Sequence, residues 1–248
     1  MRNENKIISI ALEGINRSGK GTQIELLKNK LEEIGIPCVS IRGEGYRRGL
    51  GVSQADPESD FWRKISEQLK NVKNGAEWSL WDEASYRLAR ELIVWRDRIL
   101  TKEITKPSAP FDFGVLLIDR SLISKATLKS LQLEPPPKKI FSNEELYPPG
   151  LKHRKRITAD MILPDLIIEL SAPKEILLTR LDASDPDYDF KRNNIDNKYE
   201  QYAKAKEHLS EAIKNRIVNI DSSGEPDEVY KKILEEIKIR FPELEALK

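Results

Sequence analysis

The sequence predicts an α/β fold in which a five-stranded parallel sheet carries helices on both faces. Short apolar runs alternate with longer amphipathic stretches along the 248 residues, a pattern typical of parallel sheets built from strand–helix–strand units. The runs are rich in β-branched residues and almost continuously apolar, as expected for strands buried on both faces. They span residues 7–12, 36–41, 115–118, 166–170 and 217–220.

Helical patterns fill the intervals between the expected strands. They cover residues 21–34, about 59–72, about 77–105, about 121–131, 174–181, 195–215 and 225–241. Three segments interrupt the alternation: a Gly/Arg-rich stretch at 42–51, a Pro-rich stretch at 133–156 and an acidic stretch at 182–187. Loops of this kind in a compact domain are usually functional or mobile.

Composition and charge restrict the classes of partner. Charged residues make up 33% of the chain, hydrophobic residues make up 39%, and the net charge is +1. No overall field therefore draws the protein to nucleic acid or membranes, and we expect neither as a partner. The N-terminal apolar run ends at Glu13 and is too short for a signal peptide or a membrane span. A basic run at 152–156 has no interleaved aromatic residues, which favours a solvated loop over a nucleic-acid contact.

The chain has a single cysteine, Cys38. One cysteine excludes an internal disulfide and fits a reducing compartment, so we expect a cytoplasmic protein. Cys38 falls in the second expected strand, where we interpret it as a small apolar residue rather than as a nucleophile.

A glycine-bounded loop after the first expected strand carries the most specific signal. Residues 14–22 read Gly-Ile-Asn-Arg-Ser-Gly-Lys-Gly-Thr and lead into a helical pattern. Glycines let a backbone curl so that several N–H groups face one anion, and the N-terminus of the next helix adds positive potential. An ordinary strand-to-helix turn is the alternative, but the strand before, the lysine and the helix after favour a phosphate-binding loop. The expected phosphate contacts are Gly14, Asn16, Ser18, Gly19, Lys20, Gly21 and Thr22.

Particular side chains of this loop have expected roles. Lys20 supplies a point charge for the outer phosphates of a nucleoside triphosphate. Gly21 stands where a Ser or Thr is usual, so the hydroxyl that would hold magnesium comes one position later, at Thr22. Arg17 could neutralise charge on a transferring phosphoryl group, or could be a solvated loop side chain.

Charged residues close several of the expected strands. In open α/β sheets, ligands bind beyond the carboxyl ends of the strands, so these residues should meet at one edge. They are Arg42 after the second strand, Asp119-Arg120 after the third and Asp221-Ser222-Ser223 after the fifth. Asp165 precedes the fourth strand and should lie at the opposite edge, so we do not expect it in the site.

The pair Asp119-Arg120 is the strongest candidate at that edge. Asp119 could hold magnesium directly or through water, and Arg120 could grip a phosphate with two hydrogen bonds. The alternative for the pair is a surface ion pair that ends a strand. Arg42 is favoured as a phosphate contact over a solvated side chain. The expected catalytic residues are Lys20, Arg17, Asp119 and Arg120, with Thr22 and Asp119 as metal ligands.

Together these features resemble the thymidylate kinases, a family of nucleoside monophosphate kinases. Residues 13–23, Glu-Gly-Ile-Asn-Arg-Ser-Gly-Lys-Gly-Thr-Gln, are similar to the family's Glu-Gly-x-Asp-x-x-Gly-Lys-Ser/Thr-Thr-Gln loop. Further landmarks agree in order and spacing over nearly the whole chain: Asp97-Arg98, Asp119-Arg120, Pro164-Asp165-Leu166 and Asp221-Ser222. The resemblance implies a single three-layer P-loop kinase domain over residues 1–248, with a lid at about 182–194, an acceptor-side insert at about 43–75 and a long loop at about 133–160.

The resemblance also implies an activity and roles for residues. Family members use ATP and Mg²⁺ to phosphorylate a nucleoside monophosphate in nucleotide biosynthesis, as in dTMP + ATP giving dTDP + ADP, and are commonly homodimers. Lys20 and Arg17 would hold the donor phosphates, while Asp119 and Arg120 would serve magnesium and the acceptor phosphate. On the acceptor side, Arg42 would face the phosphate, Arg98 the base and Asn16 the sugar, and Lys191 and Arg192 belong to the lid.

The chain departs from the family on the acceptor side. Asn16 replaces an Asp, Val94 aligns with the aromatic residue that usually stacks on thymine, and Ser121 replaces a Tyr. Gly21 resembles adenylate kinases instead. The donor side is nearly intact. We therefore expect ATP-dependent phosphorylation of a nucleoside monophosphate, either thymidine monophosphate or a divergent acceptor.

Other functions fit parts of the pattern. A GTPase or ATPase switch is disfavoured because the guanine-reading Asn-Lys-x-Asp motif is absent: Asn197-Lys198 continues with Tyr199-Glu200. A non-catalytic nucleotide-binding protein and a kinase of a non-nucleotide small molecule stay open, because the acceptor-side positions have changed.

Overall fold

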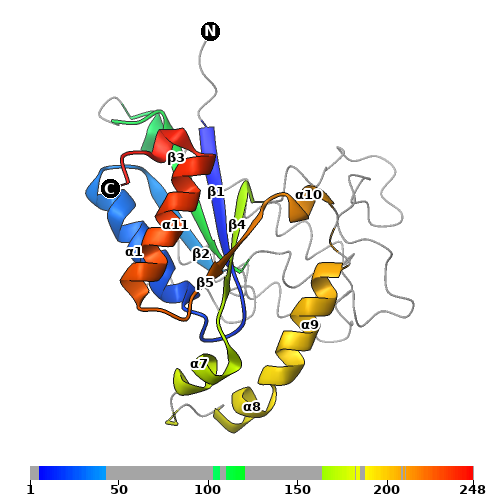
Figure 1. Ribbon diagram of the computed structural model, residues 1–248. Coiled ribbons are helices and arrows are strands. Elements are labelled where there is room, and N and C mark those ends of the chain that lie inside the picture. The colour runs from blue at the N-terminus through cyan, green and yellow to red at the C-terminus, as the bar shows by residue number, and fades with distance from the viewer. Residues whose placement is uncertain are drawn as a thin grey trace, which may run out of the picture.

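Five parallel strands form one sheet in the computed structural model (Figure 1). The structure describes residues 6–42, 103–106, 110–120, 164–181, 183–184, 188–207, 209 and 211–247. The strands are β1 (Lys6–Glu13), β2 (Cys38–Arg42), β3 (Phe113–Asp119), β4 (Leu166–Ser171) and β5 (Ile217–Asp221). All five predicted strands are confirmed, with ends that lie within two residues of those expected.

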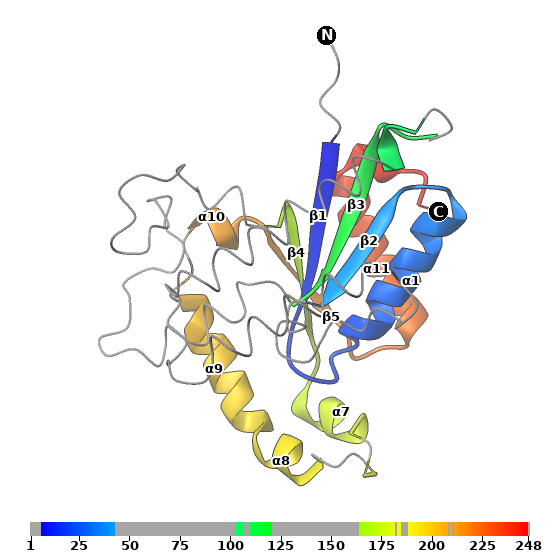
Figure 2. The ribbon, with the colours of Figure 1, turned by 180° about the vertical axis from the view of Figure 1, so that it is seen from behind.

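The central strand of the sheet is β1. The spatial order is β2-β3-β1-β4-β5, and β1 pairs in parallel with β3 on one side and β4 on the other (Figure 2). The chain thus builds one half of the sheet and then crosses β1 to build the other half. Ligands of open α/β sheets bind outside the carboxyl ends of the strands at such a switch point, so the topology itself favours a site at the loop after β1.

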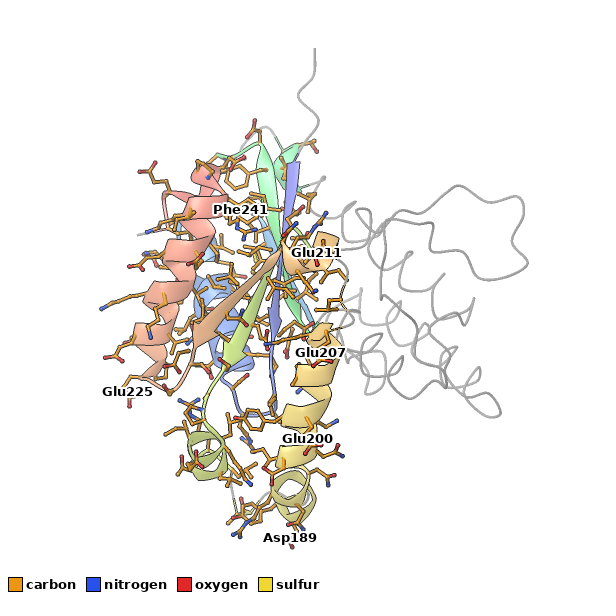
Figure 3. All side chains as sticks on the ribbon, turned by 45° about the vertical axis from the view of Figure 1, so that its right-hand side comes forward. Asp189, Glu200, Glu207, Glu211, Glu225 and Phe241 are labelled. Atoms are coloured by element: carbon orange, nitrogen blue, oxygen red, sulfur yellow. The ribbon has the colours of Figure 1, made fainter. Side chains whose placement is uncertain are left out.

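Helices lie on both faces of this sheet, as predicted. The described helices are α1 (Lys20–Glu33), α7 (Lys174–Thr179), α8 (Tyr188–Asn193), α9 (Ile195–Glu207), α10 (Glu211–Lys214) and α11 (Pro226–Arg240), followed by the 3₁₀ helix η1 (Pro242–Leu244). Figure 3 shows the sheet nearly edge-on, with α1 and α11 on one side and α9 and α10 on the other. The α/β class with a five-stranded parallel sheet is therefore confirmed.

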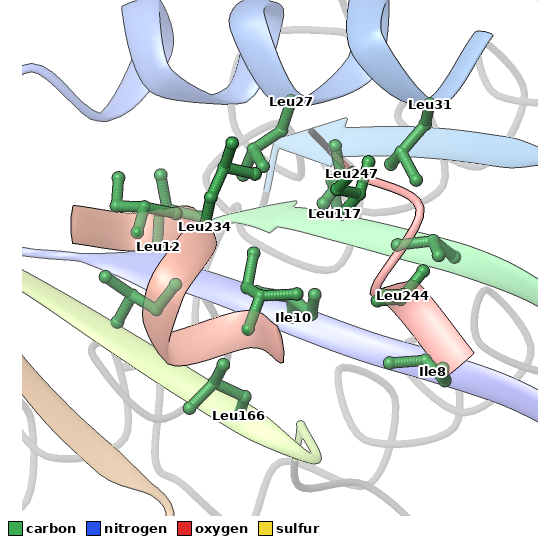
Figure 4. Packing of buried hydrophobic residues seen from close by; sticks show 14 of the residues in the cluster. Ile8, Ile10, Leu12, Leu27, Leu31, Leu117, Leu166, Leu234, Leu244 and Leu247 are labelled. Carbon is green, nitrogen blue, oxygen red and sulfur yellow. The ribbon is translucent and has the colours of Figure 1, made fainter. Parts of the chain in front are cut away.

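The larger core lies between the sheet and the layer formed by α1 and α11 (Figure 4). Strand alternation places the even-numbered residues of β1 on this face, and Ile10 and Leu12 are buried there. Helix α1 contributes Leu27 and Leu31, and α11 contributes Leu234. Because both β1 and α1 are anchored in this core, the core positions the loop that joins them.

Residues 195–215 form two helices rather than the predicted one. Between the end of α9 and the start of α10, the buried Leu209 packs with Ile213 against Ala11 and Ile167 on the second face of the sheet. Residues 208–210 include neither Gly nor Pro, so no local signal predicts a break. We attribute the break to the burial of Leu209 against the sheet, a tertiary contact.

Part of the expected lid at 182–194 is a helix that the sequence does not predict. Residues Tyr188–Asn193 form the short helix α8, which leads directly into α9. The charged composition of this stretch hides the helix, because few apolar residues mark a helical period there.

Several predictions fall outside the described part of the chain. They concern the helices at 59–72 and 121–131, most of the helix at 77–105, the insert at 43–75, the loop at 133–160 with its basic run, and Arg98, Val94 and Ser121. Among the described residues, no helix combines the length and the apolar character that a membrane crossing requires.

Cys38 lies in β2, where it packs half-buried against the larger core. Burial, and after it the Glu32 carboxylate, raises the pKa of the thiol to about 12, although the Lys28 ammonium opposes the shift. The thiol is therefore protonated at neutral pH, whereas the thiolate is the nucleophilic form. This supports the interpretation of Cys38 as a strand residue.

Asp165 lies at the amino end of β4, as predicted. Its Oδ2 atom accepts hydrogen bonds from the backbone N–H and the hydroxyl of Ser9, both at 2.7 Å. Ser9 belongs to β1, so this carboxylate ties β4 to the central strand. The contact gives Asp165 a structural role.

Candidate functional site

The loop between β1 and α1 turns through left-handed backbone conformations. The φ angle is +134° at Gly14, +69° at Arg17 and +92° at Gly19, which caps the N-terminus of α1. The Ser18 N–H donates to the Ile15 carbonyl oxygen at 3.2 Å and closes the turn. Glycine adopts such angles with little steric cost, which is why a glycine-bounded sequence can fold back on itself here.

Gly14 is also required by the close approach of β4. A Cβ atom at Gly14 would lie 2.3 Å from the Leu170 carbonyl oxygen and 2.8 Å from the Ser18 hydroxyl oxygen. The first distance is far below van der Waals contact, and the carbonyl is held in the sheet. The loop can therefore leave β1 at this point only if residue 14 has no side chain.

The Lys20 side chain lies inside this loop, and the residue is only 7% exposed. Its Nζ atom donates to the carbonyl oxygens of Gly14 at 3.0 Å and Ile15 at 2.8 Å, and lies 3.4 Å from the Ser18 hydroxyl. The sequence predicts that Lys20 reaches outward to phosphates, whereas here its charge is folded back onto loop oxygens. The ammonium still lies at the N-terminus of α1, where the helix dipole also attracts anions.

Asn16 and Arg120 meet at this loop. A guanidinium N–H of Arg120 donates to Asn16 Oδ1 and joins the loop to the end of β3. The Arg120 backbone N–H donates to the Leu12 carbonyl oxygen at 3.0 Å. Arg120 has a φ of +62°, and among the described residues it and Arg17 are the non-glycine residues with positive φ. Such backbone costs roughly 1 kcal/mol or more and clusters at functional sites.

The carboxyl ends of the strands lie along one edge of the sheet, as predicted. Arg42 pairs in register with Asp119, and Asp119 pairs with Leu12 near the end of β1. On the other side of β1, Ser171 of β4 pairs with Asp221 of β5. The structure thus places the predicted strand-end residues along the edge of the sheet from which the loop leaves β1, with Arg98 outside the described residues.

The predicted magnesium ligands, Thr22 and Asp119, lie in the first turn of α1 and at the end of β3. Alternation with Leu117 puts Asp119 on the strand face that packs against α1. Both side chains offer the oxygen donors that Mg²⁺ prefers. Within the described ranges, no three His, Cys, Asp or Glu side chains gather as metal ligands. A magnesium ion here would therefore draw on water and substrate phosphates for most of its ligands.

The predicted lid residues Lys191 and Arg192 lie in α8. Arg192 is exposed, and in the part of the chain that the structure describes no hydrogen bond or ion pair joins it to the loop.

Helix α9 makes contacts at this edge that sequence reasoning missed. The Tyr202 hydroxyl donates to the Gly14 carbonyl oxygen at 3.2 Å. Lys206 Nζ lies 2.7 Å from Oε1 of Glu169, a buried carboxylate on β4. No sequence signal marks Tyr202, because a tyrosine in a charged helix does not reveal which backbone carbonyl it will meet.

Arg180, at the C-terminal end of α7, holds the loop after β5. Its guanidinium donates to the carbonyl oxygens of Ser222 at 2.9 Å, Ser223 at 3.2 Å and Gly224 at 3.3 Å. Asp221 Oδ1 accepts hydrogen bonds from the Ser223 hydroxyl at 2.6 Å and the Ser223 N–H at 2.9 Å. These two bonds lower the pKa of the Asp221 carboxyl. The predicted strand-end stretch at 221–223 therefore makes structural contacts here.

Comparison with known proteins adds no relative. No protein-family model matches the chain, and no curated protein matches it. The function must therefore be inferred from the residues and geometry of the loop and the sheet edge.

Proposed function

We propose that this protein transfers the terminal phosphoryl group of ATP to a nucleoside monophosphate, as a thymidylate kinase-like enzyme with a P-loop kinase fold. One observation carries the proposal: the buried Lys20 ammonium lies in a left-handed glycine turn at the carboxyl end of the central strand. A positive charge, a helix N-terminus and a switch point coincide there, and each favours a polyphosphate. By analogy with the family, we also propose a homodimer in the cytoplasm that takes part in nucleotide biosynthesis.

The proposed chemistry is an in-line displacement at phosphorus. An oxygen of the acceptor phosphate bonds to the γ-phosphorus of ATP while the bond to the β–γ bridging oxygen breaks, which yields ADP and a nucleoside diphosphate. The chain contributes position and charge rather than a covalent intermediate. The loop amides and Lys20 would hold the donor phosphates, and Arg17 and Arg120 would offset charge on the reacting groups.

Magnesium would be held by Thr22 and Asp119, whose oxygen atoms suit this ion. When bound, Mg²⁺ neutralises charge on the donor phosphates and orients them. The role of the two side chains is to fix where that charge sits relative to the loop.

The contact between Asn16 and Arg120 bears on the charge offered to the acceptor phosphate. In the related family an Asp occupies the position of Asn16, and a carboxylate there would neutralise a neighbouring guanidinium. The neutral Asn16 amide orients Arg120 without cancelling its charge. Arg120 therefore keeps its full positive charge for the phosphate of the acceptor.

An acceptor panel tests the proposal. Nucleoside mono- and diphosphates, followed by non-nucleotide alcohols and acids, are each incubated with ATP and magnesium, and ADP formation is measured. We expect phosphorylation of at least one nucleoside monophosphate. Turnover confined to thymidylate would refute the divergent acceptor. ATP binding without transfer would select the non-catalytic nucleotide-binding protein, and transfer to a non-nucleotide alone would select the small-molecule kinase.

Arg17→Ala should lower kcat by at least about 10²-fold and change the Kd for ATP much less. Arg17 is exposed in the loop, and its charge is needed most when the phosphoryl group moves. Steady-state kinetics and equilibrium ATP binding separate the two effects. Arg240→Ala is the control, because Arg240 lies at the C-terminal end of α11, where its guanidinium donates to the Asn215 carbonyl oxygen at 3.2 Å. Equal losses in kcat and in ATP binding would argue against a role in the transition state.

A further inference from the structure

Helix α9 lies against the loop that we propose binds phosphate. The Tyr202 hydroxyl donates to the Gly14 carbonyl oxygen at 3.2 Å. The side chain of Ile15, the next loop residue, packs in an apolar cluster with Ile195 and Tyr199 of α9. The helix and the loop therefore share one polar and one apolar contact. Tyr202 and Gly14 are 188 positions apart along the chain.

The position of α9 does not depend on the Tyr202 hydroxyl. Earlier in the helix, the Tyr199 hydroxyl donates to the Ala172 carbonyl oxygen, just after β4. At its end, Lys206 pairs at 2.7 Å with Glu169 of β4. These contacts hold α9 on β4 at two points on either side of Tyr202, so removal of one hydroxyl should leave the helix in place.

Both carbonyl oxygens that hold Lys20 accept a second donor. The Gly14 oxygen accepts from Lys20 Nζ at 3.0 Å and from Tyr202 at 3.2 Å. The Ile15 oxygen accepts from Lys20 Nζ at 2.8 Å and from the Ser18 N–H at 3.2 Å. A carbonyl oxygen has two lone pairs, so each of these atoms has two donors while the ammonium is folded back.

This double donation matters when Lys20 binds a phosphate. The ammonium has three N–H groups, and in the structure it faces three loop acceptors. To donate to a phosphate it must give up at least one of them. A buried carbonyl oxygen that loses its last hydrogen-bond donor raises the free energy of the protein, whereas an oxygen that keeps one donor avoids this penalty. Ser18 keeps the Ile15 oxygen satisfied, and Tyr202 does the same for the Gly14 oxygen.

We infer that Tyr202 is a positioning residue of the phosphate loop: its hydroxyl satisfies the Gly14 carbonyl oxygen and so frees Lys20 to move from that oxygen to a phosphate. Tyr202 acts through Lys20 and does not touch the reacting atoms. The inference rests on the proposed function, because it requires a polyphosphate in the loop.

Tyr202→Phe tests the inference, because it removes the hydroxyl and keeps the ring. Calorimetric titration with inorganic tripolyphosphate and with ATP should show binding about three- to tenfold weaker than for the natural sequence. The KM for the nucleoside monophosphate should stay unchanged. Tyr199→Phe is the matched control: it removes a hydroxyl from the same helix that donates to Ala172 and not to the loop, so it should leave both affinities unchanged.

A double-mutant cycle shows whether the hydroxyl acts through Lys20. In the Lys20→Ala background no ammonium has to be released, so Tyr202→Phe should no longer weaken ATP binding. Thermal unfolding of all four variants checks that each remains folded, since a purely structural role would move the unfolding midpoint without moving the tripolyphosphate affinity.

Two results would overturn the inference. One is unchanged tripolyphosphate and ATP affinity in Tyr202→Phe, and the other is an equal loss of ATP affinity with and without Lys20. Failure of phosphate binding in the loop gives a different result, because the natural sequence itself would then bind neither tripolyphosphate nor ATP. ATP binding without phosphoryl transfer would refute only the kinase activity and would leave this test of Tyr202 valid.

Discussion

Lys20→Ala should reduce phosphoryl transfer by at least about 10³-fold while the protein remains folded. Lys20 carries the buried positive charge of the loop, at the start of α1. Without Lys20, the loop keeps its backbone amides and the helix dipole, but it loses the ammonium that would offset negative charge on the phosphoryl group during transfer. Transfer from ATP to the best acceptor of the panel measures the effect.

The fold should tolerate this change. Alanine has a high helix propensity, so it is tolerated in the first turn of α1. The two carbonyl oxygens that Lys20 contacts also keep a donor each: the Gly14 oxygen keeps the Tyr202 hydroxyl, and the Ile15 oxygen keeps the Ser18 N–H. The free energy of unfolding should therefore change by less than about 1.5 kcal/mol. Urea denaturation followed by circular dichroism measures it.

Lys28→Ala is the matched control for the loss of a lysine from α1. Lys28 is partly exposed and lies 3.7 Å from Glu32 on the same helix, an interaction of small expected energy. This variant should transfer phosphate at the natural rate. A Lys20→Ala protein that also does so would remove the central assignment.

Gly14→Ala should lower the free energy of unfolding by about 3–5 kcal/mol. Two penalties combine at this position. Residues that carry a Cβ atom rarely adopt a backbone φ angle of +134°. The new methyl group would also lie 2.3 Å from the Leu170 carbonyl oxygen, so β1 and β4 would have to separate where they leave the sheet.

The other glycines of the loop provide graded controls. Gly19 has a φ of +92° but open space where a methyl group would lie, so Gly19→Ala should cost only the backbone term, about 1–2 kcal/mol. Gly21 has open space and lies within α1, so Gly21→Ala should stabilise the protein by about 0.5–1 kcal/mol. Urea unfolding of the three variants tests this order. Equal stability of Gly14→Ala and the natural protein would show that the loop leaves β1 differently.

Local patterns in the sequence predict most of the described sheet. Each strand is a short, largely apolar run, and β3 and β4 are buried on both faces along most of their length. Such runs differ clearly from the amphipathic helices around them. The same reasoning places Arg42 and Asp119 at the carboxyl ends of β2 and β3, and it places Asp165 at the amino end of β4. These positions depend on where each strand begins and ends, which neighbouring residues determine.

Contacts between residues that are distant in the sequence cannot be predicted from local patterns in the same way. The break before α10 follows from the burial of Leu209 against Ala11 and Ile167, and no Gly or Pro marks it. The hydrogen bond from Arg120 to Asn16 spans 104 positions. Each depends on how the complete sheet brings separate segments together, so residue types within a short window do not reveal it.

The amino-acid sequence by itself determined a strand, a glycine turn with a lysine and a helix, because backbone angles and apolar periodicity are local properties. Only the tertiary structure decided that β1 lies at the centre of the order β2-β3-β1-β4-β5. It also decided that Lys20 folds back onto the Gly14 and Ile15 carbonyl oxygens, and that Tyr202 shares the first of them. The physical reason is that hydrogen bonds across the fold form only where packing has already placed donor and acceptor side by side.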